Sequence, residues 1–418
     1  MTNWSVFKFG GNSLKDSKSL NKALDIVSDC GKSPLLIVVS AMSKTTNSLE
    51  EYLQAKVIGD SVLANRILEK IKSFHFHLAD SLNLTDETLK LGLSGEWDRI
   101  EKASSDLPFD RHYDEVISAG EIVSSIILHA AIQTRYPTAS WLDARMVVRT
   151  NSNHRRADIN LIDTEKNIHE KLISQSGVWI TQGFIASSSD NGQCTTLGRE
   201  GSDYSAAIFA SVLGANELTI WKDVPGLMSG DPKVFNDVKL LEEVPYEEAM
   251  ELAFYGASVI HPKTIQPLYQ RNITLYIRSF LDRNLKETRV SNYKSLKPMV
   301  PCLIRKLDQV MLSIRTNDLS LMTEGQFSDV HNTFSNIGLV VNLVQRVAAR
   351  IVFIVSNHHI VLPLALEQLS DYNVKVEKDL VLYTVKYSDE NSRKWLAQKG
   401  IFKMEQRTES VYQILLKE

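Results

Sequence analysis

Short apolar runs alternate with helical segments from residue 5 to about residue 290, and this alternation limits the possible folds more than any other property of the chain. Residues 34–41 (PLLIVVSA) are apolar almost throughout, which is typical of a strand buried on both faces of a parallel sheet. Residues 48–110 instead carry apolar side chains at helical spacing. The alternation predicts an α/β domain with a mostly parallel sheet sandwiched by helices.

Polar loops follow the predicted strands, and ligands of open α/β sheets bind at the carboxyl ends of the strands. The first strand, residues 5–9, contains Lys8 and leads into Gly10, Gly11 and a helix. A strand, a glycine turn and a helix can hold a phosphate, although the spacing is neither GxxxxGK[ST] nor GxGxxG. Lys8 either reaches into a cleft, where it would neutralise charge on a transferring phosphoryl group, or faces solvent from an edge strand.

A second loop, residues 195–205 (TTLGREGSDYS), follows the predicted strand 178–186 and precedes a run of small residues. We expect a helix to start near Ser202, and the unpaired N–H groups of a helix start attract an anion. Arg199 adds a planar cationic donor, and Asp203 is a possible anchor for an amine or a metal ion. The alternative is an ordinary helix start that Ser202 caps.

Two further segments place polar side chains where a ligand can reach them. Ser40 and Thr46 lie in the loop after the strand 34–41 and are either ligand contacts or ordinary loop and cap residues. Glu121, in the segment SAGE, is expected at or just inside a helix start. There it either complements the helix dipole or points into the cleft to take the amino group of a zwitterionic substrate.

The segment 216–235 is predicted to be a strand that ends at Trp221, followed by a charged loop. Lys222 and Asp223 then stand at the carboxyl end of this strand, and Lys233 follows in the same loop. The two lysines could hold the phosphates and ribose of a nucleotide.

The composition of the chain changes from about Asp308. Strand and helix patterns then follow in the order βαββαβ, which is that of a ferredoxin-like unit. About 30 further residues predict one helix and two strands, too few for a complete second copy. The length of 418 residues is compatible with two or three domains.

Composition excludes several classes of function. The net charge is −3 and no block of basic residues occurs, so we expect neither a nucleic acid nor an anionic membrane as a partner. We find no apolar run of transmembrane length and no signal-peptide layout. Three scattered cysteines suggest a reducing cytoplasm and offer neither a disulfide framework nor a zinc pattern; they are Cys30, Cys194 and Cys302. We therefore predict no metal bound by side chains alone.

The chain resembles aspartate kinase over essentially its whole length. Six segments carry this resemblance in order: KFGGNSL (8–14), the loop SAMSKTTN (40–47), SAGE (118–121), TTLGREGSDYSAA (195–207), WKDVPGLMSGDPK (221–233) and GASVIHP (256–262). The resemblance implies an amino acid kinase catalytic domain at 1–295 and an ACT-type regulatory region at 300–418, whose second ACT unit is abbreviated.

The resemblance also implies site roles. Lys8 contacts the ATP phosphates and stabilises the transition state, while Glu121 binds the α-amino group of the substrate and Arg199 its α-carboxylate. Asp203 supports the substrate amine and the site geometry. Other residues implied to contact the substrate are Ser40, Thr46 and Ser202, and those implied to contact ATP are Lys8, Gly10, Gly11, Lys222, Asp223, Met228, Lys233 and Ser258.

Some positions depart from the family pattern. Asn12 replaces a threonine, Lys222 stands where a threonine is common, Lys233 stands where the family usually has arginine, and Ser258 stands where GAKVLHP has a lysine. Asn342 replaces an aspartate of lysine-sensitive enzymes, so the sequence leaves open feedback inhibition by lysine, by threonine or by no amino acid.

The implied reaction transfers a phosphoryl group from ATP to the side-chain carboxylate of L-aspartate, the first step of lysine, threonine and methionine biosynthesis. That carboxylate is ionised at neutral pH, so no general base is needed. Mg²⁺ would bridge the phosphates through phosphate and water oxygens. Two alternatives remain: a related kinase acting on glutamate, carbamate or a nucleoside monophosphate, and an inactive amino-acid sensor that uses residues 308–418. The resemblance also implies a homodimer, because ACT-type units usually pair edge to edge between chains and a lone small sheet leaves open edges.

Overall fold

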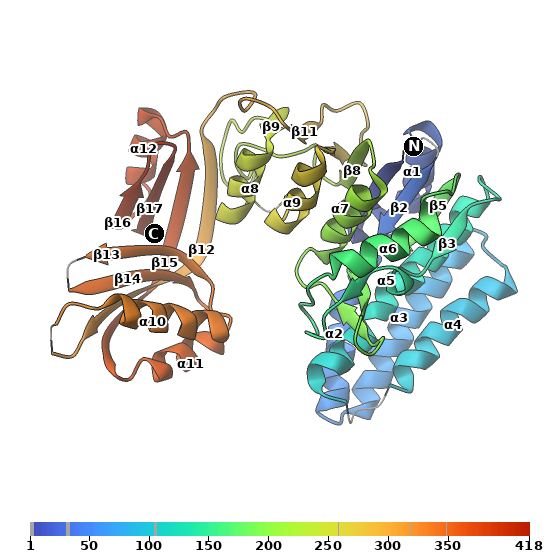
Figure 1. Cartoon of the computed structure of the whole chain (residues 1–418), viewed down its shortest axis with the longest axis horizontal. Helices are drawn as coiled ribbons and strands as arrows, with labels where there is room; N and C mark the ends of the chain where they lie inside the picture. Colours follow the sequence, from blue (N-terminus) through green and yellow to red (C-terminus); the bar gives the residue numbers. More distant parts are fainter. Residues whose placement is uncertain (1–3, 31–33, 104–106, 258, 319, 348) are drawn as a thin grey trace. The chain divides into compact units, whose positions relative to one another are not determined.

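The computed structural model describes residues 4–30, 34–103, 107–257, 259–318, 320–347 and 349–418 (Figure 1). The chain divides into two compact units, which we call unit 1 and unit 2. Unit 1 comprises Met1–Leu227, Leu240–Glu251 and Ser258–Lys297, and unit 2 comprises Met228–Lys239, Leu252–Ala257 and Pro298–Glu418.

An eight-stranded sheet forms the centre of unit 1, and all its neighbouring strands are parallel except β10 and β11. The predicted mostly parallel sheet is therefore confirmed. In spatial order the strands are β3 (Ser140–Leu142), β5 (Val178–Gln182), β2 (Leu35–Val39), β1 (Ser5–Phe9), β8 (Glu217–Lys222), β10 (Thr274–Ser279), β11 (Thr288–Ser291) and β9 (Glu243–Pro245).

The sequence explains the centre of this sheet. β2 reads LLIVV and is buried at every position, as a strand covered on both faces must be. β1 pairs with β2 on one side and with β8 on the other, so Lys8 cannot be an edge-strand lysine that faces solvent. The solvent-facing alternative for Lys8 is therefore excluded.

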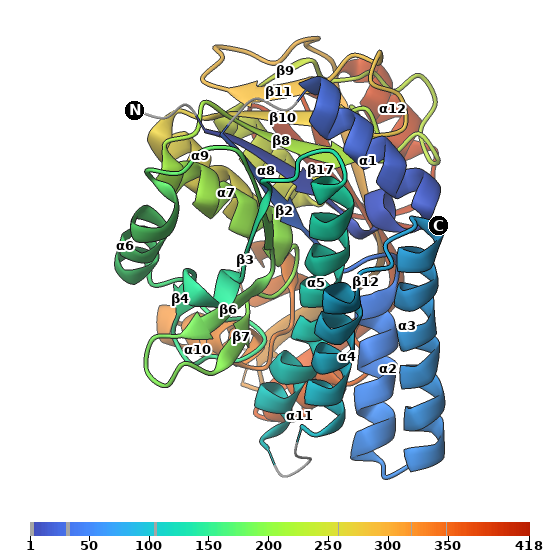
Figure 2. The same ribbon diagram turned by 90° about the vertical axis from the view of Figure 1, so that its right-hand side faces the viewer.

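Helices cover both faces of the sheet. Residues of α1 and α5 pack with Phe7 and Phe9 of β1, whereas α7 packs against β1, β2 and β8 from the opposite side. α2 to α5 lie side by side as a bundle (Figure 2). The helices of unit 1 are α1 (Ser17–Cys30), α2 (Thr45–Val57), α3 (Ser61–Ser81), α4 (Glu87–Glu101), α5 (Phe109–Gln133), α6 (Leu161–Leu172), α7 (Gly201–Leu213), α8 (Tyr246–Tyr255, shared with unit 2) and α9 (Pro262–Arg271), with short 3-10 turns η1 (Gly11–Leu14) and η2 (Ala144–Met146).

Unit 1 also contains a small three-stranded sheet, and its last strand along the chain directly precedes α7. Its strands, in spatial order, are β4 (Arg149–Thr150), β6 (Ile185–Ser188) and β7 (Cys194–Thr196). Thr195 and Thr196, predicted to open a loop, are thus the end of a strand.

α5 differs from the prediction in where it starts. It begins at Phe109 after Pro108, so Glu121 lies near the middle of the helix and not at its start. The suggestion that Glu121 complements the helix dipole is therefore wrong, because that effect is confined to the first turn. Among the described helices only α5 is long and apolar enough to cross a membrane, and 78% of that stretch is buried inside the protein, as in the core helix of a soluble protein.

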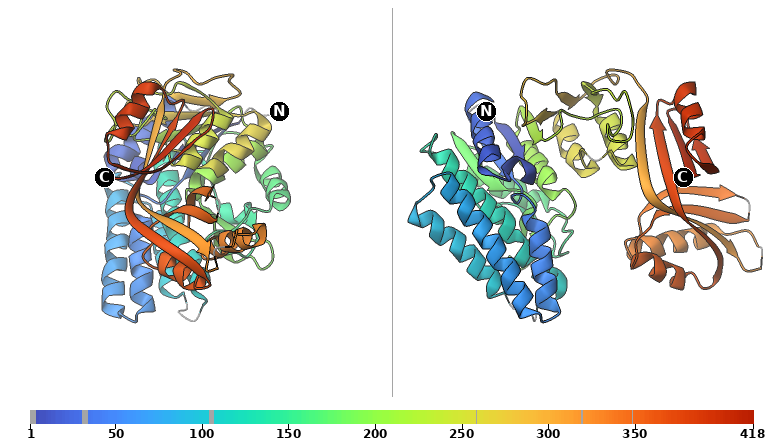
Figure 3. Two further views of the ribbon diagram at one scale, coloured as in Figure 1. Left: turned by 90° about the vertical axis from the view of Figure 1, so that its left-hand side faces the viewer. Right: turned by 180° about the vertical axis from the view of Figure 1, so that it is seen from behind.

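Unit 2 is built on a six-stranded antiparallel sheet in which β12 (Cys302–Thr316) and β15 (Tyr372–Lys386) run side by side through its centre (Figure 3). α10 (Glu324–Asn336) and α11 (Val361–Gln368) supply Val330, Phe334 and Leu362 to one hydrophobic core. The βαββαβ order is confirmed. The remaining elements are β13 (Val341–Val347), β14 (Arg350–Ser356), α12 (Glu390–Ala397), β16 (Ile401–Arg407) and β17 (Val411–Lys417).

Candidate active site

A cavity of about 750 Å³ opens in unit 1 where β1, β2 and β8 end. It brings together predicted residues from segments far apart in the chain, namely Lys8, Ser40, Thr46, Glu121, Arg199, Ser202, Asp203 and Lys222. Sequence reasoning had given no site role to several further lining residues, which are Asp110, Tyr113, His154, Arg155, Arg156, Phe184 and Glu200.

Asp203 lies between two lysines at one end of the cavity. Its Oδ1 is 2.5 Å from Lys8 Nζ and its Oδ2 is 3.2 Å from Lys222 Nζ. Burial alone would raise the pKa of Asp203, but the two ammonium groups outweigh it and hold that pKa below its usual value. Asp203 is therefore an ionised carboxylate that fixes the positions of both cations.

The first turn of α7 carries Ser202 and Asp203 into the cavity. Glu200 precedes it with φ 54°, in the left-handed region, and makes no side-chain cap hydrogen bond. The helix therefore starts where expected, but Ser202 does not cap it; Ser202 is inside the first turn. Gly183, at the end of β5, lets this turn approach closely, because a Cβ there would lie 2.6 Å from Ser202 Cα.

The glycine pair after β1 shapes the neighbouring loop. A Cβ on Gly11 would lie 2.5 Å from the carbonyl oxygen of Ala41, and the Gly11 carbonyl accepts a hydrogen bond from Ser43 N at 3.0 Å. Gly11 thus has to be glycine for the loop after β2 to pack beside it. Gly10 and Gly11 do not line the cavity, although a Cβ on Gly10 would lie 3.6 Å from Lys8 Nζ.

Glu121 reaches the cavity from α5 and is almost completely buried. Its Oε1 accepts a hydrogen bond from Ala41 N at 3.3 Å, and its Oε2 has no partner among the described residues. Burial raises the pKa of Glu121 to about 8, more than the Ala41 N–H and Lys8 lower it. The cavity therefore holds a carboxyl group that a cationic ligand group would ionise.

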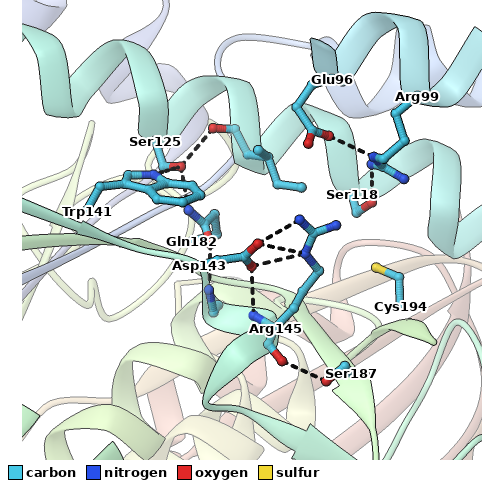
Figure 4. A network of polar contacts seen from close by, with 12 residues as sticks. Glu96, Arg99, Ser118, Ser125, Trp141, Asp143, Arg145, Gln182, Ser187 and Cys194 are labelled. Carbon is cyan, nitrogen blue, oxygen red and sulfur yellow. Dashed lines mark hydrogen bonds and ion pairs between the residues drawn. The ribbon is translucent and has the colours of Figure 1, made fainter. Parts of the chain in front are cut away.

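A buried polar network holds α5 against its neighbours (Figure 4). Ser125 Oγ, on the same helix as Glu121, accepts hydrogen bonds from Gln182 Nε2 at 2.6 Å and Trp141 Nε1 at 2.9 Å. Ser118, which precedes Glu121 in the same helix, accepts a hydrogen bond at its Oγ from Arg99 of α4 at 3.0 Å. These contacts fix the helix segment from which Glu121 projects.

A further part of the cavity lining comes from the loop before α6. Asp114, fully buried, accepts hydrogen bonds from His154 Nδ1 (2.8 Å), Arg155 N (3.0 Å) and Thr196 Oγ1 (2.6 Å). Arg155 has φ 67°, and its guanidinium lies 4.6 Å from the ring centre of Tyr113. The adjacent arginines 155 and 156 were the only sequence signal for this part of the lining, and they suggested no role by themselves.

Only some of the residues predicted to contact the nucleotide line this cavity. Lys222 lines it, whereas Asp223 does not; Asp223 Oδ2 accepts a hydrogen bond from Asn12 Nδ2 at 3.3 Å. Met228 and Lys233 belong to unit 2 and do not line the cavity, and Ser258 lies outside the described residues. The roles of these residues stay predictions.

No group of three or more His, Cys, Asp or Glu that could hold a metal ion occurs in the described part of the chain. Both oxygens of Asp203 face lysines, so this carboxylate is not available as a ligand. A divalent ion held mainly by phosphate and water oxygens fits such a site.

Comparison with known proteins identifies relatives of this chain. The model of the amino acid kinase family matches residues 3–279. The lysine-sensitive aspartokinase 3 of Escherichia coli (strain K12) is 31% identical over 345 residues, which are 81% of this chain and 75% of that protein. A chloroplastic bifunctional aspartokinase/homoserine dehydrogenase 1 of Zea mays is 35% identical over 299 residues, but the chain covers only 32% of its length.

The solved structures that this chain resembles include two of an aspartokinase. The crystal structure of E. coli aspartokinase III in complex with aspartate and ADP (R-state) is 27% identical and matches with a TM-score of 0.82, covering 99% of this chain and 96% of that one. The complex of aspartokinase III with lysine and aspartate (T-state) covers the same shares at 27% identity, with a TM-score of 0.78.

Proposed function

Because the chain belongs to the amino acid kinase family, and within it to the aspartokinases, we propose that it phosphorylates the side-chain carboxylate of L-aspartate with ATP. The product is 4-phospho-L-aspartate, the first intermediate in the biosynthesis of lysine, threonine and methionine. One observation carries this proposal: Lys8, Glu121 and Arg199 line a single cavity. They supply a cation for phosphate and a pair of opposite charges for an amino acid.

Glu121 and Arg199 suit the backbone groups of a zwitterionic substrate. The Arg199 guanidinium pairs with the α-carboxylate through parallel hydrogen bonds. The α-ammonium group approaches Glu121, whose free Oε2 gains a donor and whose proton is released. With both backbone groups held, the side-chain carboxylate of aspartate extends toward Lys8.

Phosphoryl transfer then needs alignment and charge neutralisation. An oxygen of the aspartate side chain attacks the γ-phosphorus of ATP, a P–O bond forms, and the bond to the β-phosphate oxygen breaks to release ADP. Lys8, held by Asp203 at 2.5 Å, neutralises charge that develops on the transferring group. Mg²⁺ bound with the nucleotide would supply further neutralisation of the phosphate charge, and no side chain has to act as a base because the nucleophile is already ionised.

The test is a coupled ADP-release assay with Mg-ATP and a panel of aspartate, glutamate, carbamate and a nucleoside monophosphate. We expect activity with aspartate, and loss of turnover in Lys8→Ala with an unchanged circular dichroism spectrum. Lys90→Ala, at an exposed position on α4, is the control and should retain full activity. Normal turnover by Lys8→Ala, or a preference for another acceptor, would contradict the proposal.

Regulation and assembly complete the proposal. An amino-acid effector is expected at unit 2, since the relative from E. coli was solved with lysine. At position 342 an effector's ammonium group would meet the amide of Asn342 and not a carboxylate. This amide already accepts a hydrogen bond from Lys306 at 2.7 Å and donates one to Gln309 at 2.7 Å. Inhibition assays with lysine, threonine and methionine identify the effector.

The edge strands of the unit 2 sheet, β13 and β16, leave backbone groups open for pairing with a second copy. We expect a homodimer by light scattering; a monomer would contradict this. Cys194 and Cys302 are buried cysteines, and buried thiols suit the cytoplasm, where thiols stay reduced.

A further inference from the structure

The end of the cavity at β8 contains more positive than negative charge. Asp203 contacts both Lys8 and Lys222, and the exposed fractions of the three side chains are 3%, 8% and 20%. One carboxylate cannot balance two ammonium groups, and an excess charge in a buried position costs free energy unless an anion approaches it. The trio therefore suits an anionic ligand group.

The sheet explains why the two lysines meet. β1 and β8 are parallel neighbours, and Lys8 is paired with Ile220. Since side chains two positions apart in a strand share a face, Lys222 lies on the same face as Lys8, one pleat nearer the carboxyl end. This is the face that α7 covers, and α7 carries Asp203 in its first turn. Both ammonium groups thus point to the edge of the sheet at which ligands bind.

A second contact of Lys222 connects it to another part of the site. Its Nζ donates a hydrogen bond to the carbonyl oxygen of Val259. Val259 directly follows Ser258, the position at which related sequences have a lysine in GAKVLHP, whereas position 222 in them is commonly a threonine. The ammonium group of Lys222 therefore lies beside the residue that follows position 258 in the chain.

We propose that Lys222 is a second catalytic cation, which contacts the nucleotide phosphates and shares with Lys8 the charge of the transferring phosphoryl group. This deepens the role expected for Lys222 and rests on the proposed kinase function. Asp203 then has the task of orienting both cations, one with each carboxylate oxygen.

The first experiment replaces Lys222 by methionine, which keeps the length of the side chain and removes its charge. We expect kcat to fall by about 100-fold or more, as when one donor to a transition-state anion is lost, with KM for aspartate changed less than about threefold. ADP binding, measured by calorimetry, should weaken about tenfold. Lys90→Met is the matched control and should change neither quantity.

The second experiment exchanges the two positions. Lys222→Thr alone should lose turnover as Lys222→Met does, and the double variant Lys222→Thr/Ser258→Lys should recover at least tenfold of it. A residue that only supports the packing of Asp203 would not be replaced by a lysine introduced from another segment. The exchange also decides the question if Lys222→Met does not fold.

A kcat of Lys222→Met within threefold of wild type, or unchanged ADP affinity, would overturn the proposal. A folded double variant that recovers nothing would do the same. These outcomes are separable from failure of the proposed function: if wild type prefers another acceptor, that acceptor replaces aspartate, and the ADP measurement needs no acceptor at all.

Discussion

Glu121 is the residue of the site whose protonation depends most clearly on its surroundings. It is 3% exposed, it accepts one hydrogen bond, and burial raises its pKa from the ordinary value of 4.5 to about 8. Without bound substrate, the carboxyl group is therefore mostly protonated at neutral pH. An approaching ammonium group reverses this, because a paired carboxylate is favoured over a neutral acid.

The raised pKa of Glu121 predicts a dependence of stability on pH. Between pH 4.5 and about 8 the folded protein binds a proton at Glu121 that the unfolded chain does not. The stabilisation from this proton is complete below pH 4.5 and is lost as the pH rises through the folded-state pKa of about 8. We expect Glu121→Gln to remove this loss, so wild type should lose about 4 kcal/mol more than the variant between pH 5 and 8.5.

Urea unfolding without substrate at a series of pH values measures this difference. Other titrating groups are common to both proteins and cancel in the comparison. Parallel curves for wild type and Glu121→Gln over this range would show that the carboxyl group keeps an ordinary pKa.

At the scale of elements, Ser125 determines how α5 meets β3 and β5. Its hydroxyl accepts from Gln182 and Trp141, and both it and the Gln182 side chain are fully buried. Ser125→Ala leaves one buried donor and one partly buried donor without an acceptor, so we expect the free energy of unfolding to fall by about 2–4 kcal/mol. Ser73→Ala, at an exposed position within α3, should change it by less than about 0.5 kcal/mol. Equal effects in a denaturant titration would contradict the importance of this network.

The contact between β5 and α7 gives a second prediction at this scale. Gly183→Ala places a methyl group 2.6 Å from Ser202 Cα, so the first turn of α7 must move. We expect a loss of about 1–3 kcal/mol in stability and a tenfold or larger drop in kcat, because Asp203 moves with that turn. The same substitution at Gly95 in α4 meets no atom within 4 Å and should stabilise the protein by about 0.5–1 kcal/mol. Wild-type turnover by Gly183→Ala would contradict the argument.

Sequence reasoning located one side of the cavity well and missed the other. Lys8, Ser40 and Lys222 follow or end parallel strands, and a local pattern is enough to place such residues at one edge of a sheet. His154 and Arg155 line the cavity because Asp114, some 40 positions earlier, binds their loop. Such a contact between distant segments has no local pattern.

Local patterns also gave correct residues for incorrect reasons. Glu121 does line the cavity, but the segment SAGE predicts a helix start near it, whereas the helix begins at Phe109. A continuous helix and an interrupted one share the same periodicity, and the apolar positions of α5 do not reveal which turn is first.

At the scale of the whole molecule, the chain crosses between its two units several times. Segments 228–239 and 252–257 are flanked by unit 1 in the sequence but belong to unit 2. Phe235 is 4% exposed and packs with Tyr383 and Leu396, a core that the C-terminal segment does not complete by itself.

We therefore expect Phe235→Ala to destabilise unit 2 by about 3–5 kcal/mol, although residue 235 lies in the loop after β8. Hydrogen exchange should report faster exchange in β15 and β17, with the amides of β1 and β2 unchanged. Phe254→Ala, at a 65% exposed position, is the control. Faster exchange in β1 instead of β15 would show that Phe235 supports unit 1.

Because unit 2 consists of three separate chain segments, the design of chimeric enzymes has to take all three into account. A chimera joined once, near residue 298, would combine the antiparallel sheet of another enzyme with the original Phe235 and its neighbours. Phe235 would then pack against side chains that it does not fit, and the core of unit 2 would be mismatched. A graft that exchanges 228–239, 252–257 and 298–418 as one set keeps every native contact of the donor's module.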